Sequence, residues 1–225
     1  MARTIDTAIF DLGGVIMRNG SPADLARRFP GLDPAVVLNI LMGPYHEDTH
    51  HPWHRLERGE VTLAEARAAN LAAFEAAGVG APPPLTEMAF ETNEEMVELV
   101  RDLRGGGLRT GLLTNNAREL RDRWWALLPY DELFDDVVDS HEVGMRKPNP
   151  AIYRLALERL GATADRTAFL DDIASNVAAA LAEGMVGVLV VDDVVTTGAT
   201  LRAAEAALHQ AGARAVHCLA AAATP

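Results

Sequence analysis

The pattern of hydrophobic and polar positions divides this chain of 225 residues into two kinds of segment. After residue 108, short apolar runs alternate with amphipathic stretches. This alternation predicts strands near 108–113, 136–139, 167–171 and 185–191, and helices near 117–127, 149–160 and 173–183. An earlier apolar run stops at Asp11 and is followed by Gly13-Gly14, which predicts a first buried strand ending in a tight loop. Alternating strands and helices form a parallel sheet covered on both faces, so the fold class is α/β.

The region between the first strand and residue 108 has a helical pattern instead. Residues typical of helix starts occur at Ser21-Pro22, Asp33-Pro34 and the capping box Thr62–Glu65. Three consecutive prolines at 82–84 predict an extended linker, and a further helix is expected from Thr86 to about Arg104. The sequence therefore predicts a core domain of residues 1–16 and 96–225 with an all-helical insertion at 17–95.

Polar side chains follow three of the predicted strands. They are Asp11, Thr114 with Asn115, and the pair Asp171-Asp172. Carboxyl ends of parallel strands meet at one edge of a sheet, where open α/β folds place their chemistry. Each feature also has an ordinary structural interpretation: a turn-forming aspartate, a helix N-cap and a solvated acidic loop, respectively.

Lys147 is the only lysine of the chain. The chain has 20 Lys and Arg residues in all, and the other 19 are arginines. A compact ammonium suits a site that needs a point charge beside an anion, whereas guanidinium is a wide planar fork. Taken alone, a single lysine is more readily interpreted as an accident of composition.

Together, in this order and spacing, Asp11, Thr114, Lys147 and Asp171-Asp172 resemble the four motifs of the haloacid dehalogenase (HAD) superfamily of phosphohydrolases. The resemblance covers about residues 5–190. It is nearest to the branch containing sugar-1-phosphate phosphatases and the phosphatase domain of soluble epoxide hydrolase. It implies a Rossmann-like core and a helical cap that closes over the substrate, a small-molecule phosphate ester.

The resemblance also implies a role for each motif residue. Asp11 would be the nucleophile that forms an aspartyl-phosphate, and Lys147 would balance charge in the transition state. Thr114 and Asn115 would hold phosphoryl oxygens. Like-charged carboxylates ~4 Å apart repel by about 4 kcal/mol at an effective dielectric near 20, which a divalent cation would relieve. The expected ligands of Mg²⁺ are Asp11, Asp172 and the Gly13 carbonyl, with Asp171 acting directly or through water.

Gly13 departs from the usual family pattern, which has a second aspartate two residues after the nucleophile as general acid and base. Members of the resembling branch also carry glycine there. A leaving group of low basicity, as in a sugar-1-phosphate or an acyl phosphate, would need that acid least. Dehalogenation fits less well, because that chemistry does not use the metal-binding acidic pair.

The segment 188–225 resembles the phosphoribosyl pyrophosphate (PRPP) segment of type I phosphoribosyltransferases, especially the competence-protein F group. A possible phosphate-binding loop comprises Asp192, Asp193, Thr196, Thr197, Gly198 and Thr200. We expect this segment to supply only a last strand and a helix over 200–211. The alternatives are a ribose-phosphate binding protein and a chimeric chain without activity.

The insertion concentrates titratable side chains between residues 46 and 54. These are His46, Glu47, Asp48, His50, His51 and His54. Their types suit zinc, but a polar mouth between the insertion and the core is the favoured interpretation. Trp53 is interpreted as a packed aromatic side chain.

Bulk composition limits the partners. A net charge of −12 argues against nucleic-acid and anionic-membrane surfaces. No run approaches the ~18 apolar residues of a membrane span, and the start of the chain does not resemble a signal peptide. The single Cys218 excludes an internal disulfide. A cytoplasmic enzyme without nucleic-acid or membrane partners is expected.

Overall fold

A computed structural model describes residues 5–18, 33–44, 46–78 and 90–190, together with the backbone of 194–195 and 222–223. Its centre is a five-stranded parallel sheet in the order β3-β2-β1-β4-β5. The strands are β1 (Thr7–Phe10), β2 (Arg109–Thr114), β3 (Asp136–Asp139), β4 (Thr167–Asp171) and β5 (Val186–Leu189). The predicted parallel α/β sheet is therefore confirmed, with β1 in the middle.

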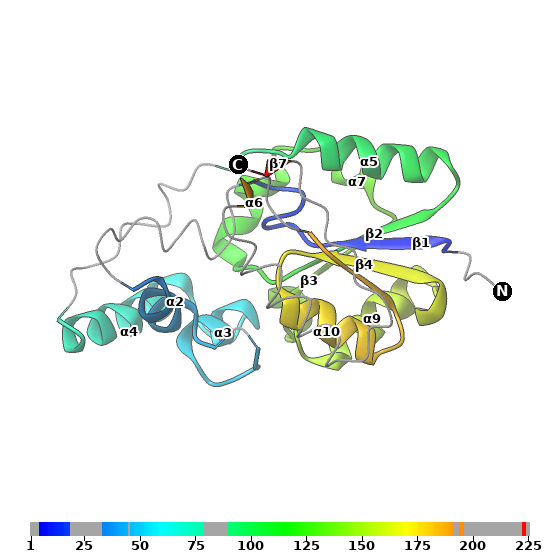
Figure 1. The fold of residues 1–225 in the computed structure, drawn as a ribbon. Coiled ribbons are helices and arrows are strands. Elements are labelled where there is room, and N and C mark those ends of the chain that lie inside the picture. Colours follow the sequence, from blue (N-terminus) through cyan, green and yellow to red (C-terminus); the bar gives the residue numbers. More distant parts are fainter. Residues whose placement is uncertain are drawn as a thin grey trace.

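Helices cover both faces of this sheet (Figure 1). One face carries α5 (Glu94–Gly105), α6 (Arg121–Trp125) and α7 (Tyr130–Leu133); the other carries α9 (Pro150–Leu160) and α10 (Ala174–Ala182). Alternate residues of β1 supply the two cores, because successive side chains of a strand point to opposite faces. Phe10 packs toward α5 and α7, whereas Ile9 packs toward α9 and α10.

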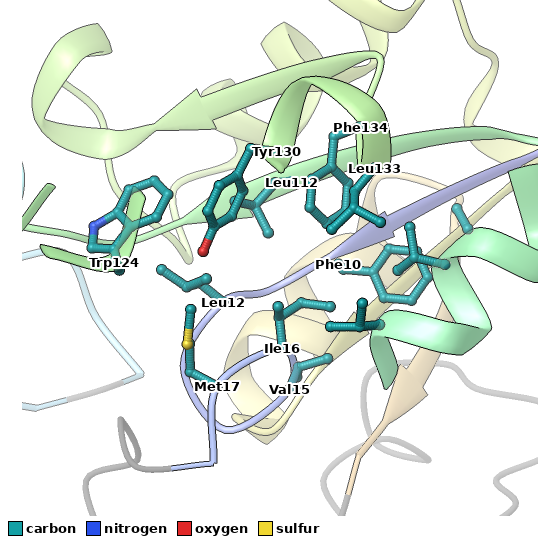
Figure 2. Packing of buried hydrophobic residues seen from close by; sticks show 13 residues of the cluster. Phe10, Leu12, Val15, Ile16, Met17, Leu112, Trp124, Tyr130, Leu133 and Phe134 are labelled. Atoms are coloured by element: carbon teal, nitrogen blue, oxygen red, sulfur yellow. The ribbon is translucent and has the colours of Figure 1, made fainter. Parts of the chain in front are cut away.

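The core on the α5 side also holds the loop that follows β1. Figure 2 shows Val15, Ile16 and Met17 from this loop gathered with Phe10 and the aromatic side chains of α6 and α7. All three loop side chains are at most 1% exposed. The loop after Asp11 is therefore held by apolar packing as well as by its backbone.

The insertion contains α2 (Pro34–Met42), α3 (Pro52–Glu57) and α4 (Leu63–Ala76), which pack against one another beside the sheet (Figure 1). The predicted start of α2 is confirmed, since Asp33 Oδ1 accepts from Ala35 N at 2.9 Å. The capping box of Thr62 and Glu65 is likewise present at the start of α4. The helix start at Ser21 lies outside the described residues, and the boundaries 17 and 95 stay predictions.

Two predicted helices have different bounds in the structure. The helix expected from Thr86 begins only at Glu94, and residues 79–89 are not described. Residues 91–93 pair with the loop after β1 instead: Arg18 N donates to Glu91 O, and Asn93 N donates to Ile16 O. Tertiary pairing thus replaces the helical bonds that the local pattern favoured.

The helix expected at 117–127 is divided into a 3-10 turn, η2 (Arg118–Leu120), and α6. Pro129 follows closely and occupies the N-cap position of the next short helix, α7. Proline has no backbone N–H and cannot continue a preceding helix without disrupting it. The core domain has two other short helical elements after residue 108, α8 (Ser140–Val143) and η3 (Ala164–Arg166).

The carboxyl-terminal segment contributes part of β5, which pairs with β4 in parallel and is shorter than the predicted 185–191. A separate pair, β6 (Val194–Val195) and β7 (Ala222–Ala223), is also parallel. The predicted helix over 200–211 lies outside the described residues. Among the described helices, none is long and apolar enough to span a membrane.

Candidate active site

Three predicted site residues stand at the carboxyl ends of neighbouring strands. Thr114 ends β2, Asp11 directly follows β1, and Asp171 ends β4. Asp11 N donates to Leu170 O at 2.8 Å, which continues the strand pairing through the aspartate. The three residues are 2%, 7% and 0% exposed, respectively. The sheet therefore brings polar groups into an enclosed space at one edge, as the sequence predicted.

Lys147 lies between two of these carboxylates. Its Nζ is 2.7 Å from Asp11 Oδ1 and 2.7 Å from Asp171 Oδ2, and its side chain is 1% exposed. The Phe169 ring lies beneath the ammonium, with its centroid 5.6 Å away. The neighbouring carboxylates raise the pKa of Lys147 against the effect of burial, so this side chain is cationic.

Asp171 is saturated by donors from the protein. Oδ1 accepts from Ile173 N at 2.7 Å, and Oδ2 accepts from Lys147. Asn176 Nδ2 lies 3.2 Å from Oδ1 and 3.0 Å from Oδ2. This carboxylate is thus fixed in place and orients Lys147.

Asn115 is occupied by the backbone of Lys147. Its Oδ1 accepts from Lys147 N at 2.8 Å, and its Nδ2 donates to Lys147 O at 3.0 Å. Asn115 therefore fixes the loop that carries Lys147. Its predicted contact with a phosphoryl oxygen stays a prediction.

Asp172 lies against the backbone of Gly14. A Cβ built on Gly14 would stand 2.1 Å from Asp172 Oδ2 and 2.4 Å from its Cγ, and Gly14 has φ of +76°. Glycine is therefore required here both for the turn and for the approach of the acid. The predicted Gly13 position is adjacent and bridges to Met17.

Replacing Gly14 with alanine should lower the free energy of unfolding by about 1–3 kcal/mol, because Ala is strained at positive φ and collides with Asp172. Chemical denaturation measures this loss. Gly78→Ala is the matched control, since Gly78 has φ of +70° but nothing within 4 Å of its Cβ position. Equal losses in the two variants would show that strain alone acts and that the contact with Asp172 is unimportant.

Asp11, Asp171 and Asp172 each offer an oxygen within 4.8 Å of the others, and they are the only such group of potential metal ligands among the described residues. Three carboxylates and one ammonium leave a net charge of −2 when all are ionised. Burial raises the pKa of Asp11 to about 7, although Lys147 opposes the shift. Burial and both neighbouring acids raise the pKa of Asp172 well above its ordinary value. Clustered hard oxygen donors with uncompensated charge fit a divalent cation such as Mg²⁺.

The raised pKa of Asp11 makes the stability of the metal-free protein depend on pH. The folded protein binds this proton more tightly than the unfolded chain, whose Asp pKa is about 3.8. The contribution of Asp11 is thus present at low pH and is lost as pH rises to about 7. We expect the Tm of wild type to fall relative to the Tm of Asp11→Asn as pH rises from about 3.8 to about 7. A difference that is constant with pH would contradict the shift.

Two histidines of the histidine-rich segment in the insertion have structural roles. His51 Nδ1 accepts from Trp53 N at 3.2 Å and caps α3. His54 is buried, its Nδ1 accepts from Thr49 N at 3.0 Å, and burial lowers its pKa to about 3. In the described part of the chain these side chains form no three-ligand metal group, so the zinc interpretation has no support.

The possible phosphate-binding loop at 192–200 lies outside the described side chains. Conversely, the structure adds three site-related residues that sequence reasoning missed: Gly14, Asn176 and Arg146. Gly14 stood beside a recognised motif, and Asn176 lies five residues after Asp171. Arg146 becomes important only through its contact with Glu57, which is 89 residues away in the sequence.

Comparisons with known proteins give a consistent family. Residues 5–184 match the family model of haloacid dehalogenase-like hydrolases. The chain is 29% identical over 205 residues to the sesquiterpene phosphatase AstK of Aspergillus oryzae, covering 87% of this chain and 95% of that protein. It is also 29% identical over 202 residues to mouse bifunctional epoxide hydrolase 2, with 81% of this chain but only 36% of that protein covered.

Solved structures show the same fold. A HAD family enzyme from Bacteroides thetaiotaomicron, in complex with magnesium and inorganic phosphate, superposes with a TM-score of 0.57 at 20% identity. The match covers 83% of this chain and 94% of that one. With the parallel sheet, the clustered strand-end residues and the match over residues 5–184, the chain belongs to the haloacid dehalogenase-like hydrolases.

Proposed function

We propose that this hydrolase is a Mg²⁺-dependent phosphatase that acts on a small phosphate monoester through an aspartyl-phosphate on Asp11. The observation that carries the proposal is the arrangement of Lys147 between Asp11 and Asp171, with Asp172 completing an acidic cluster. A buried ammonium beside a potential nucleophile and a cluster that fits a divalent cation supply what phosphoryl transfer needs, namely positioning and charge compensation.

Each side chain has a distinct task in this proposal. A carboxylate oxygen of Asp11 forms a bond to phosphorus while the bond from phosphorus to the ester oxygen breaks. Lys147 neutralises charge on the phosphoryl oxygens, and Thr114 offers a hydroxyl at the neighbouring strand end. Asp11, Asp172 and the carbonyl of Gly13 would hold Mg²⁺, which would supply Lewis-acid stabilisation of the phosphoryl group. Water then cleaves the aspartyl-phosphate, releasing phosphate and restoring Asp11.

The leaving group departs without a carboxylic acid at position 13. Gly13 has no side chain, so the ester oxygen must leave with little help or take its proton from water. Esters whose leaving groups are weakly basic should therefore be turned over faster. A sugar-1-phosphate fits this requirement, and similarity to a sesquiterpene phosphatase makes isoprenoid phosphates the second class to test.

A panel of sugar-1-phosphates, sugar-6-phosphates, isoprenoid phosphates and acyl phosphates, assayed with Mg²⁺ and with EDTA, tests the proposal. We expect phosphate release that requires Mg²⁺ and is faster for anomeric than for primary alkoxide leaving groups. A haloacid in the same panel reports on dehalogenation. Halide release without metal, together with no phosphate release from any ester, would contradict the proposal.

Binding of the cation also has a readout that is independent of turnover. Mg²⁺ should raise the Tm in proportion to the logarithm of its concentration, because it binds the folded cluster and not the unfolded chain. Asp172→Asn should weaken this effect, and Asp165→Asn, an exposed aspartate in η3, should leave it unchanged. Equal Mg²⁺ stabilisation of Asp172→Asn and wild type would exclude Asp172 as a ligand.

A further inference from the structure

Arg146 and Glu57 form a buried ion pair between the helical insertion and the loop that carries Lys147. Arg146 Nε donates to Glu57 Oε2 at 2.6 Å, and the two side chains are 1% and 5% exposed. The other oxygen of Glu57 accepts from Trp53 Nε1 at 2.8 Å. Glu57 is the last residue of α3, so one helix of the insertion ends directly on a side chain of the core.

The same guanidinium makes a second contact with the insertion. Arg146 Nη1 donates to the backbone carbonyl of Glu47 at 2.8 Å and lies 4.0 Å from Asp48 Oδ1. Asp48 is in turn paired with Arg58, which also donates to Thr49 O at 3.0 Å. Arg146 thus contacts both the end of α3 and the loop before it, through Nε and Nη1 respectively. Its position therefore depends on the position of the insertion.

Lys147 directly follows Arg146, and the two side chains have their partners in different parts of the protein. The ammonium contacts Asp11 and Asp171 of the core, whereas the guanidinium contacts the insertion. Asn115 holds the Lys147 backbone from the end of β2. Consecutive Cα atoms are about 3.8 Å apart, so a displacement of Arg146 reaches Lys147 through a single peptide unit.

We infer that Arg146 and Glu57 are positioning residues, which place the Lys147 ammonium against Asp11 when the insertion is docked. The catalytic consequence rests on the proposed phosphatase function, but the positioning itself does not. Removing one partner of a buried pair leaves the other charge uncompensated and displaces it. A misplacement of about 1 Å at a reacting centre can slow turnover about 10²-fold.

A purely electrostatic role for Arg146 makes a different prediction. Glu57→Gln removes a negative charge beside Arg146, so a field effect would strengthen phosphate binding and lower KM. Positioning instead lowers kcat and leaves KM nearly unchanged, because the interaction that is lost acts in the transition state. Whether Glu57→Gln lowers kcat or lowers KM therefore distinguishes the two explanations.

Because Lys147 is the only lysine, protein carrying isotope-labelled lysine gives one side-chain NMR signal from the chain itself. We expect Glu57→Gln and Arg146→Gln each to move this signal and to lower kcat by about tenfold or more. The double variant should lose no more than about twofold beyond the worse single variant, since both changes break one interaction. Arg146→Lys should not restore the signal, because one ammonium cannot span Glu57 Oε2 and the Glu47 carbonyl.

Arg154→Gln is the matched control. Arg154 Nε is 2.7 Å from Glu183 Oε2, which is similar geometry in an exposed pair between α9 and the end of α10. This variant should keep the lysine signal and kcat of wild type. Trp53→Phe removes one donor to Glu57 while keeping the ion pair, so it tests the same contact if the charge-removing variants fail to fold. It should move the signal in the same direction by a smaller amount.

A lysine signal at its wild-type position in the folded members of this series would overturn the inference, as would an unchanged kcat in active Glu57→Gln. If wild type hydrolyses no phosphate ester while the signal moves as expected, the proposed function fails and the positioning stands. If wild type is active and Asp11→Asn is inactive, but Glu57→Gln matches wild type in signal and kcat, the positioning alone fails.

Discussion

Asp11→Asn should abolish turnover, with kcat lowered by about 10⁴-fold or more, the range observed when a covalent nucleophile is removed. The amide has no carboxylate oxygen with which to attack phosphorus. Its carbonyl can still accept from Leu12 N, which donates to Asp11 Oδ1 at 2.7 Å in wild type. The fold should therefore persist, and purified protein assayed against the best ester of the panel measures the effect.

The stability of this variant provides an internal control. Asp11 is buried and its pKa is raised to about 7, so replacing it removes a charge that the metal-free fold accommodates poorly. The Tm of metal-free Asp11→Asn at pH above 7 should therefore equal or exceed that of wild type. Hydrolysis by this variant at the wild-type rate would show that Asp11 is not the nucleophile.

Lys147→Arg should lower kcat about 10²-fold although the charge is kept, comparable to the loss of one oxyanion donor. The ammonium of Lys147 fits between two oxygens at 2.7 Å in a space that is almost closed to solvent. A guanidinium is wider and planar, so it cannot contact both carboxylates from the same place without displacing them. Steady-state kinetics on the folded variant measure the loss.

Arg154→Lys is the control for this exchange of cations, since Arg154 is exposed and pairs with Glu183 away from the acidic cluster. It should leave kcat unchanged. Near-normal kcat in Lys147→Arg would mean that the single lysine of the chain is an accident of composition and that any cation suffices at this position.

The strand-end residues could be predicted from the sequence because a parallel sheet has a simple geometry. Apolar runs that end at Asp11, Thr114 and Asp171 predicted parallel strands whose carboxyl ends lie at one edge of the sheet. The order of the strands, which makes these three neighbours, comes from the structure. Lys147 was predicted on its rarity and its place among the motifs. Its contacts with Asp11 and Asp171 show that the ammonium belongs to the same cluster.

Contacts between distant segments could not be predicted in the same way. Arg146 and Glu57 are 89 residues apart in sequence, and nothing in the local pattern of either selects the other as its partner. The two bonds between the Asn115 amide and the backbone of Lys147, 32 residues away in the sequence, were likewise not predicted. The late start of α5 has a similar cause, since residues 91–93 pair with the loop after β1. Local propensity competes with such tertiary bonds and loses to them.

The most direct measurement of the central claim is mass spectrometry of the peptide containing Asp11 after rapid acid quench during turnover. We expect this peptide from wild type, mixed with substrate and Mg²⁺, to carry one phosphoryl group on Asp11, and the modification to disappear when substrate is exhausted. Asp11→Asn should show none under the same conditions. Rapid phosphate release by wild type without any phosphorylated peptide, together with release by Asp11→Asn at a similar rate, would contradict the account.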